Sequence, residues 1–254
     1  MKVIILCGGE GTRLREETEF RPKPMVEIGG RPILWHIMKL YAHHGFKDFY
    51  VALGYQGEFI KHYFHHYYAL NGSFSIDLAS GEINSRGTPT EDWRVHLIDT
   101  GIETNTGGRV KRLKPFLDSE TFMVTYGDGV SNVCLTSLLE FHRRQGRLAT
   151  LTAVRPPARF GEIALEQGRV VEFIEKPGSG DGWINGGFMV FEPEIFQYLE
   201  DDSTGLEVLE RVAQDGQLAA YAHDGYWQCM DTIRDRRRLE QEWALGDRPW
   251  KVWD

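Results

Sequence analysis

The chain has 254 residues, 41% hydrophobic and 26% charged, which is the composition of an ordinary globular protein with a substantial core. Its formal net charge of −8 argues against nucleic acid or a membrane surface as a partner, because either would need a basic face. Cys7, Cys134 and Cys229 are far apart and match no metal-ligand or redox spacing, and the first apolar run is too short for a signal peptide or membrane span. We therefore expect buried free thiols in a reducing compartment, with the cytoplasm as the default location.

The segment 2–25 combines a predicted strand with a glycine-rich loop. Residues 2–7 (KVIILC) are a short apolar run, typical of a strand buried on both faces of a parallel sheet. In the loop 8–11 (GGEG), glycines allow backbone N–H groups to approach an anion that a Cβ would obstruct. Arg13 and Lys23 add positive charge on either side, and Lys23 stands between two prolines that stiffen the backbone. The segment predicts a phosphate-binding loop, with a plain turn between strands as the alternative.

Two common nucleotide-binding motifs do not fit this loop. A P-loop requires Lys followed by Ser or Thr after its glycines, and no such pair follows here. The dinucleotide motif GxGxxG fails because Leu14 takes the place of the third glycine, and Glu27 lies in a proline-flanked segment instead of ending a strand. A dinucleotide-dependent oxidoreductase is therefore disfavoured.

The pattern downstream alternates between helix and strand. A helix that opens at Pro32 and ends at Gly45 precedes a strand at 49–53 and a helix at 56–67, whose aromatic stripe we expect to pack in the core. This succession predicts parallel pairing through right-handed crossovers, and hence an open doubly wound sheet. Residues 71–94 break the rhythm, because a Ser, Gly and Thr-rich composition with weak alternation favours a short antiparallel pair or another excursion.

Further elements follow in the same way until a strand-rich segment begins near residue 148. Before it we expect strands at 94–100 and 121–126 and helices at 106–114 and 135–145. Within it we expect strands at 149–154, 162–165, 170–174 and 183–191. These mixed or antiparallel strands should close over the sheet, a natural place for a second substrate. The remaining expected elements are helices at 193–199, 206–214 and 233–243 and a strand with a loop at 221–230.

Two charged residues stand at predicted element ends that favour ligand binding. Asp128 lies between two glycines after the strand 121–126, and ligands of open α/β sheets bind beyond the carboxyl ends of strands. An Asp between glycines is also a frequent turn former, so this position alone leaves both readings open. Arg109 follows two glycines at a predicted helix start, where backbone donors converge.

Several short motifs occur in a fixed order from one end of the chain to the other. They are GGEGTRL (8–14), RPKPM (21–25), EIGGRPILWHIMKLY (27–41), DTG (99–101), TGGR (106–109), TYGDG (125–129), EKP (175–177), INGGF (184–188) and WQCMDT (227–232). In this order and spacing, the chain resembles the sugar-1-phosphate nucleotidylyltransferase family over essentially its full length.

The resemblance implies a fold and an activity. The fold would be Rossmann-like α/β, an open, mostly parallel mixed sheet flanked by helices, with additional antiparallel strands covering the sugar site. The chain would be a single domain, with a nucleotide-binding part (about 1–147), a sugar-phosphate-binding part (about 148–232) and a C-terminal helix and tail (233–254). Within the family, the likeness is to the branch that transfers a cytidylyl group from CTP to α-D-glucose 1-phosphate, giving CDP-glucose and diphosphate. The alternatives are UTP, dTTP or GTP as donor, or a non-catalytic nucleotide-sugar-binding protein.

The resemblance also implies roles for individual residues. Arg13 and Lys23 would be the catalytic cations, beside the departing pyrophosphate and the α-phosphate respectively. Asp128 and Asp231 would hold Mg²⁺, which prefers such hard oxygen ligands. The residues implied for nucleotide binding are Leu6, Cys7, Gly8, Gly9, Glu10, Gly11, Thr12, Arg13, Lys23, Thr104, Arg109, Gly127 and Asp128. The residues implied for the sugar phosphate are Glu175, Lys176, Asn185, Gly186 and Gly187.

Assembly and biological setting are implied in the same way. Family members are commonly homo-oligomers, so we expect a homo-oligomer, with a hexamer as one arrangement. The excursion 71–94 and the tail bearing Trp250 and Trp253 are candidate contact regions, although tryptophans in a tail also dock on the body of their own fold. The expected setting is the supply of CDP-linked deoxysugars for bacterial lipopolysaccharide and its O-antigen.

Overall fold

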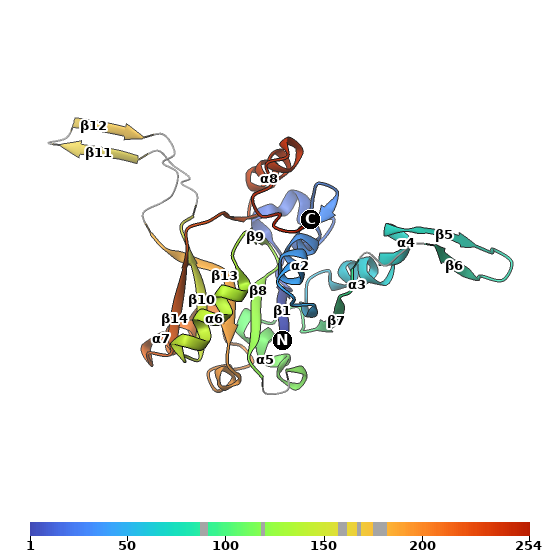
Figure 1. The fold of residues 1–254 in the computed structure, drawn as a ribbon, viewed down its shortest axis with the longest axis horizontal. Helices are drawn as coiled ribbons and strands as arrows, with labels where there is room; N and C mark the ends of the chain where they lie inside the picture. Colours follow the sequence, from blue (N-terminus) through green and yellow to red (C-terminus); the bar gives the residue numbers. More distant parts are fainter. Residues whose placement is uncertain (87–90, 118–119, 157–161, 167–168, 175–181) are drawn as a thin grey trace.

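A seven-stranded sheet organises the molecule in the computed structural model, which describes residues 1–86, 91–117, 120–156, 162–166, 169–174 and 182–254 (Figure 1). The strand order is β14-β10-β13-β8-β1-β4-β7, and only β13 runs antiparallel to its two neighbours. The strands are β1 (Lys2–Cys7), β4 (Asp48–Leu53), β7 (Arg94–Asp99), β8 (Phe122–Tyr126), β10 (Ala149–Val154), β13 (Ile184–Phe191) and β14 (Leu218–His223). The expected open, mostly parallel mixed sheet is confirmed.

Helices cover both faces of this sheet. In β1, Val3, Ile5 and Cys7 pack on one face and Ile4 on the other, so the strand is buried on both sides as its apolar run predicts. The first face is covered by α2 (Ile33–His43) and α6 (Leu135–Gln145), and the second by α5 (Thr106–Arg112) and α7 (Gly205–Gln214). Short elements complete the chain: η1 (Thr12–Leu14), α1 (Arg15–Thr18), η2 (Lys23–Met25), β2 (Glu27–Ile28), β3 (Arg31–Pro32), η3 (Lys114–Phe116) and η4 (Pro193–Gln197).

The segment after β4 differs in part from its prediction. The expected helix at 56–67 divides into α3 (Gly57–His65) and α4 (Tyr67–Asn71), and Phe59 is 44% exposed, so the aromatic stripe is not wholly in the core. The expected antiparallel pair is present as β5 (Ser73–Ile76) and β6 (Ile83–Arg86). Figure 1 shows this hairpin projecting from the body of the molecule.

The second half supplies the expected antiparallel strands, but not as a cover over the sheet. Strand β13 lies within the main sheet, and β11 (Glu162–Glu166) pairs with β12 (Arg169–Ile174) in a separate ribbon that stands away from it in Figure 1. A third small pair, β9 (Gly129–Ser131) with β15 (Trp227–Cys229), joins two distant parts of the chain. This last pair brings residues 128 and 230 into contact.

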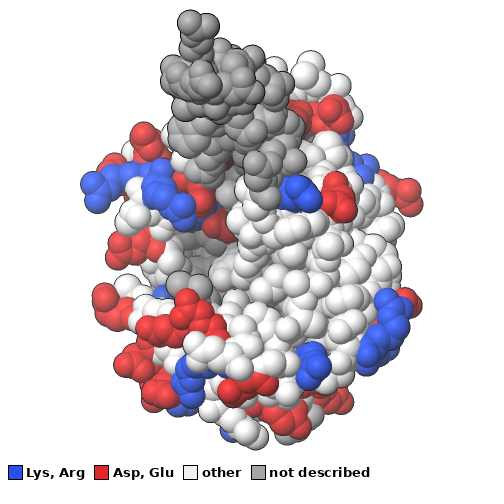
Figure 2. Space-filling model, turned by 90° about the vertical axis from the view of Figure 1, so that its left-hand side faces the viewer, with Lys and Arg blue, Asp and Glu red and all other residues white. Residues whose placement is uncertain are grey.

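The C-terminal helix α8 (Ile233–Leu245) leads into a tail that folds back on its own chain. Trp250 is 1% exposed and stacks on Tyr226 with ring centroids 5.7 Å apart, while Trp253 lies edge-on to Trp35 at 6.0 Å. The tail tryptophans therefore belong to the core of this chain. Figure 2 shows acidic and basic side chains interspersed over one face, and among the coloured residues there is no broad basic surface. None of the helices within the described ranges is long and apolar enough to span a membrane.

Candidate active site

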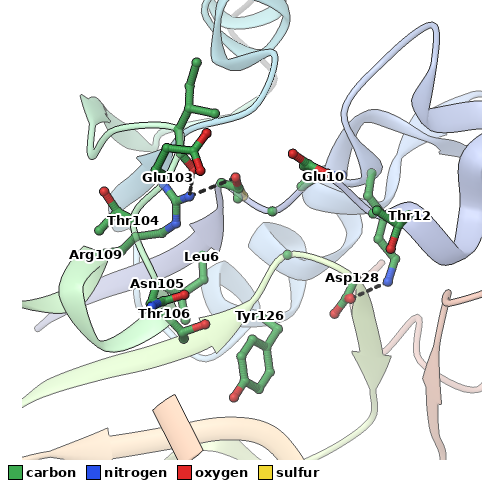
Figure 3. Close-up of a pocket in the computed structure, with 18 of the residues that line it drawn as sticks. Leu6, Glu10, Thr12, Glu103, Thr104, Asn105, Thr106, Arg109, Tyr126 and Asp128 are labelled. Atoms are coloured by element: carbon green, nitrogen blue, oxygen red, sulfur yellow. Dashed lines mark hydrogen bonds and ion pairs between the residues drawn. The ribbon is translucent and has the colours of Figure 1, made fainter. Parts of the chain in front are cut away.

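A cavity of about 520 Å³ opens at the carboxyl ends of β1 and β8 (Figure 3). All thirteen residues expected to bind the nucleotide line it, so the structure brings that predicted set together, while its role stays a prediction. The lining residues that the sequence did not suggest are Pro24, Ile102, Glu103, Asn105, Thr106 and Tyr126. In Figure 3, Glu103, Thr104 and Arg109 gather at one end of the cavity, and Thr12 and Asp128 lie at the other.

The three loop glycines are needed for three different reasons. A Cβ at Gly8 would lie 2.1 Å from Cζ of Arg109, so this glycine makes room for a side chain of the protein. Gly11 has a φ of +64°, and a Cβ there would lie 2.9 Å from Cγ2 of Thr18. Only Gly9 has nothing within 4 Å of its Cβ position. The sequence predicts that all three glycines make room for an anion. Of the three, only Gly9 has open space at its Cβ position.

Arg109 lies buried beneath the loop, and both of its terminal nitrogens are hydrogen-bonded within the protein. Its guanidinium donates hydrogen bonds to the Thr100 hydroxyl and to four backbone carbonyls, with lengths from 2.7 to 3.1 Å. The four carbonyls belong to Gly8, Leu53, Gly101 and Ile102. Burial, reinforced by Arg112, lowers the pKa of Arg109. Arg109 lines the cavity, as its assignment to the nucleotide pocket requires, and its donors tie the glycine loop to the turn at 100–102.

Lys23 lies between the two predicted metal ligands. Its Nζ donates to Oδ2 of Asp128 at 2.6 Å and to Oδ1 of Asp231 at 2.5 Å. Burial opposes the charged ammonium, but Asp128 and Asp231 outweigh it and raise the pKa of Lys23. Pro22 is extended and Pro24 lies inside η2, so the backbone that carries this lysine is stiff.

The β9 and β15 pair explains how the two aspartates meet. Gly129 pairs with Cys229, and the N–H of Met230 donates to the carbonyl of Asp128 at 2.8 Å. Asp231 then follows Met230 and precedes Thr232, the N-cap of α8, whose first turn is closed by a capping box between Thr232 and Asp235. Asp235 Oδ2 also accepts from the N–H of Asp231 at 3.2 Å. Two acidic residues about a hundred positions apart therefore contact one ammonium.

Arg13 lies at the solvent-exposed edge of the same cluster. Its Nη1 lies 2.8 Å from Oδ2 of Asp231, and its side chain is 72% exposed. An exposed arginine has freedom to turn toward a bound anion, in contrast to Arg109. The structure thus places the two predicted catalytic cations and the two predicted metal ligands in one contiguous group.

The chain matches a protein family along most of its length. The model of the family described as nucleotidyl transferase matches residues 2–237. The chain belongs to this nucleotidyl transferase family. Glucose-1-phosphate cytidylyltransferases of Salmonella typhi and Salmonella typhimurium are each 46% identical to it over 257 residues, covering all of both chains. The crystal structure of HddC from Yersinia pseudotuberculosis has the same fold, with a TM-score of 0.70, 21% identity and coverage of 95% of this chain and 99% of that one.

Three of the predicted sugar-side residues of this nucleotidyl transferase, Asn185, Gly186 and Gly187, lie near the start of β13 and are not among the residues that line the cavity. Oδ1 of Asn185 accepts from the N–H of Gly187 at 2.9 Å, and the carbonyl of Gly186 accepts from the indole of Trp227 at 2.8 Å. A Cβ at Gly187 would lie 2.6 Å from the ring of Tyr126, so this glycine lets β13 approach the cavity wall. Glu175 and Lys176 lie outside the described residues.

The thiols of the transferase are free, and only Cys7 is fully buried. Burial, with Asp128 adding to it, raises the pKa of the Cys7 thiol. Burial together with Asp231 and Asp128 raises the pKa of Cys229 to about 11. Neither thiol near the cavity is a thiolate at neutral pH, which removes them as nucleophiles.

The donor set at Asp128 and Asp231 suits magnesium better than a metal held entirely by protein. Within the described ranges, no three His, Cys, Asp or Glu side chains lie close enough together to hold a metal ion. Magnesium commonly takes one or two carboxylates and completes its shell with water and substrate phosphates. Two carboxylates that converge on one ammonium, with Asp128 lining the cavity, fit that requirement.

Proposed function

We propose that this nucleotidyl transferase transfers a cytidylyl group from CTP to α-D-glucose 1-phosphate, giving CDP-glucose and diphosphate. The observation that carries the proposal is the convergence of Lys23, Arg13, Asp128 and Asp231 in one cluster, of which Arg13, Lys23 and Asp128 line the cavity. The choice of CTP and glucose 1-phosphate is supported by 46% identity, over the whole chain, to relatives named glucose-1-phosphate cytidylyltransferase.

Charge neutralisation is the main task of such a site. Both reactants are anions, and two unit charges about 4 Å apart interact by roughly 4 kcal/mol at an effective dielectric constant of 20. Lys23 at the cavity wall is suited to the α-phosphate, where a phosphate oxygen of the sugar attacks. Arg13, which is exposed at the rim, is suited to the pyrophosphate that leaves. Alignment and neutralisation suffice, because the nucleophile is already an anion.

The glycine loop and the turn at 101–106 would hold the nucleotide. Gly9 offers open space for the triphosphate next to backbone N–H groups. At the opposite end of the cavity, Leu6 and Thr104 are placed to contact the base and ribose, with Arg109 fixing the loop beneath them. This division assigns phosphate binding to the residues near Asp128 and nucleoside binding to those near Glu103.

Asp128 and Asp231 would hold Mg²⁺, and the ion would supply positive charge between the reacting phosphates. On the acceptor side, we assign Lys176 and Glu175 to the sugar phosphate and Asn185, Gly186 and Gly187 to the sugar. An amide carries both donor and acceptor, which suits hydroxyl groups; the oxygen of Asn185 accepts from Gly187, and its Nδ2 makes only a long contact of 3.9 Å with the sulfur of Met189.

We further propose that the enzyme is cytoplasmic, forms a homo-oligomer and supplies CDP-linked sugars for lipopolysaccharide O-antigen. The hairpin of β5 and β6 is the preferred contact region, because it exposes large apolar side chains: Phe74, Ile76, Leu78 and Ile83. Two-stranded hairpins are marginally stable alone, so a subunit contact would stabilise it. Light scattering of the purified chain, compared with a variant in which Phe74 and Leu78 are replaced by Ser, tests this assignment.

The assignment of substrates is tested by pyrophosphate release from CTP, UTP, dTTP and GTP with glucose 1-phosphate, with and without Mg²⁺. CTP should give the highest kcat/KM, and chelation should stop turnover. A preference for another nucleotide would move the enzyme to a different branch of the family. No turnover with any of the four would favour a non-catalytic nucleotide-sugar-binding protein.

A further inference from the structure

Lys23 contacts the same two carboxylates that the proposed function assigns to the metal. Its Nζ contacts one oxygen of each carboxylate, Oδ2 of Asp128 at 2.6 Å and Oδ1 of Asp231 at 2.5 Å. Hydrogen bonds this short between an ammonium and a carboxylate are charge-assisted and strong. The side chains of Lys23 and Asp231 are only 11% and 12% exposed, so water screens the contact weakly.

Both oxygens of Asp231 are therefore engaged by cations. Oδ1 faces Lys23, and Oδ2 faces Nη1 of Arg13 at 2.8 Å. A magnesium ion requires its ligand oxygens at about 2.0–2.1 Å. A divalent cation that bridged Asp231 and Asp128 would stand in the gap that Lys23 fills, and the two positive charges would repel each other strongly at that separation.

The ammonium of Lys23 can also reach the cavity. This residue lines the same cavity as the glycine loop, and its flexible four-carbon stem can swing the ammonium without moving the backbone. The neighbouring Pro22 and Pro24 hold that backbone fixed, so the movement is confined to the side chain. A triphosphate in the loop offers the ammonium new anionic partners.

We propose that Lys23 is an exchangeable cation, which holds Asp128 and Asp231 together and competes with the divalent ion for their oxygens. Nucleotide phosphates draw Lys23 away and so free the carboxylates for the metal. Binding of metal and nucleotide is then cooperative, and by linkage each must strengthen the other equally. This inference rests on the proposed function, since it takes Asp128 and Asp231 as the metal ligands.

The test is binding of Mn²⁺ to the full chain in the absence of nucleotide, measured by electron paramagnetic resonance of free Mn²⁺. Lys23→Met removes the competing charge with little change of volume, and should tighten Mn²⁺ binding at least tenfold. Lys23→Arg keeps the charge and should stay within about threefold of wild type. Adding Asp231→Asn to Lys23→Met should remove the gain. Lys23→Gln serves as a second variant if the Met form does not fold by circular dichroism.

A general electrostatic effect is controlled by Arg15→Met, which removes an exposed cation two positions from Arg13. Unchanged Mn²⁺ affinity in the folded Lys23→Met or Lys23→Gln variant overturns the proposal, as does an equal gain in Arg15→Met or a gain that survives Asp231→Asn. Because no substrate is present, the result is independent of the proposed reaction. Wild-type turnover with CTP, measured separately, distinguishes failure of the exchange from failure of the assigned function.

Discussion

The guanidinium of Arg109 occupies the space that a side chain at Gly8 would need. A Cβ at Gly8 would lie 2.1 Å from Cζ of Arg109, and Nη2 donates to the Gly8 carbonyl at 3.0 Å. The same guanidinium binds carbonyls at 53, 101 and 102, so the ends of two strands are fixed against the loop. The shape of the glycine loop therefore depends on a residue from α5.

Gly8→Ala should harm the enzyme because of Arg109, not because of an anion. The extra methyl group should cost about 1–3 kcal/mol of unfolding free energy and raise KM for the nucleotide. Gly9→Ala, at a position with open space, is the matched comparison and should cost less stability.

A double-mutant cycle separates these causes. In an Arg109→Ala background, Gly8→Ala should be nearly neutral in urea denaturation, since the clash is gone. Equal costs of Gly8→Ala in both backgrounds would show that Arg109 does not decide the identity of residue 8.

Arg13→Ala should slow product formation more than it weakens substrate binding. Arg13 is exposed and held only at the rim of the site, so its removal should leave the fold intact. Loss of a positioned charge at a leaving group should lower kcat by about 10²-fold. Steady-state kinetics for CTP and glucose 1-phosphate provide the readout, and Arg15→Ala is the control. A raised KM for glucose 1-phosphate with normal kcat would assign Arg13 to the acceptor instead.

The sequence predicts the regular elements well where burial is simple. The bounds of β1 and α6 agree with their predictions, because β1 is an unbroken apolar run that ends at glycine and α6 has one clear helical period. The prediction of one helix at 56–67 was wrong in part, because periodicity does not show that α3 ends at His65 or that Phe59 is exposed.

The sequence predicts which residues line the cavity better than it predicts how they contact one another. The glycine loop and Asp128 follow buried strands, which is a local signal. In contrast, Asp231 reaches Lys23 only through the pairing of β9 with β15, and Arg109 reaches Gly8 across 101 positions. Contacts of this kind leave no periodic trace in a sequence, and Tyr126 and Glu103 gave no signal that marked them as cavity residues.

We expect the burial of His36 to make the protein less stable in mild acid. Its Nε2 lies 2.9 Å from the carbonyl of Ile28, and its Nδ1 accepts from the indole of Trp250 at 3.4 Å, so the ring is neutral. Burial lowers the pKa of His36 to about 4. Between pH 6.5 and 4 the unfolded chain therefore binds a proton that the folded chain does not, and the unfolding free energy falls as pH falls.

The size of this effect is about 3 kcal/mol across the whole window, with a limiting slope of about 1.4 kcal/mol per pH unit. Urea denaturation from pH 7.5 to 4.5 measures it. His36→Gln should flatten the dependence, and an unchanged slope in that variant would assign the acid sensitivity to other groups.

Trp250 should anchor the C-terminal tail. Its side chain is 1% exposed and contacts Tyr226 and His36, so Trp250→Ala should cost about 3–5 kcal/mol in chemical denaturation. Leu245→Ala, at a residue 75% exposed, should change stability by less than about 0.5 kcal/mol. Equal effects of the two substitutions would mean that the tail does not contribute to the core.

The most direct test of the account is the turnover of Asp128→Asn, Asp231→Asn and the double variant with CTP, glucose 1-phosphate and saturating Mg²⁺. If the two carboxylates hold one ion together, each single change should lower kcat by at least about 10²-fold, and the double variant should be no slower than the slower single. Asp202→Asn, at an exposed carboxylate, is the control. Near-normal turnover of Asp231→Asn, or losses that multiply in the double variant, would contradict a shared metal site.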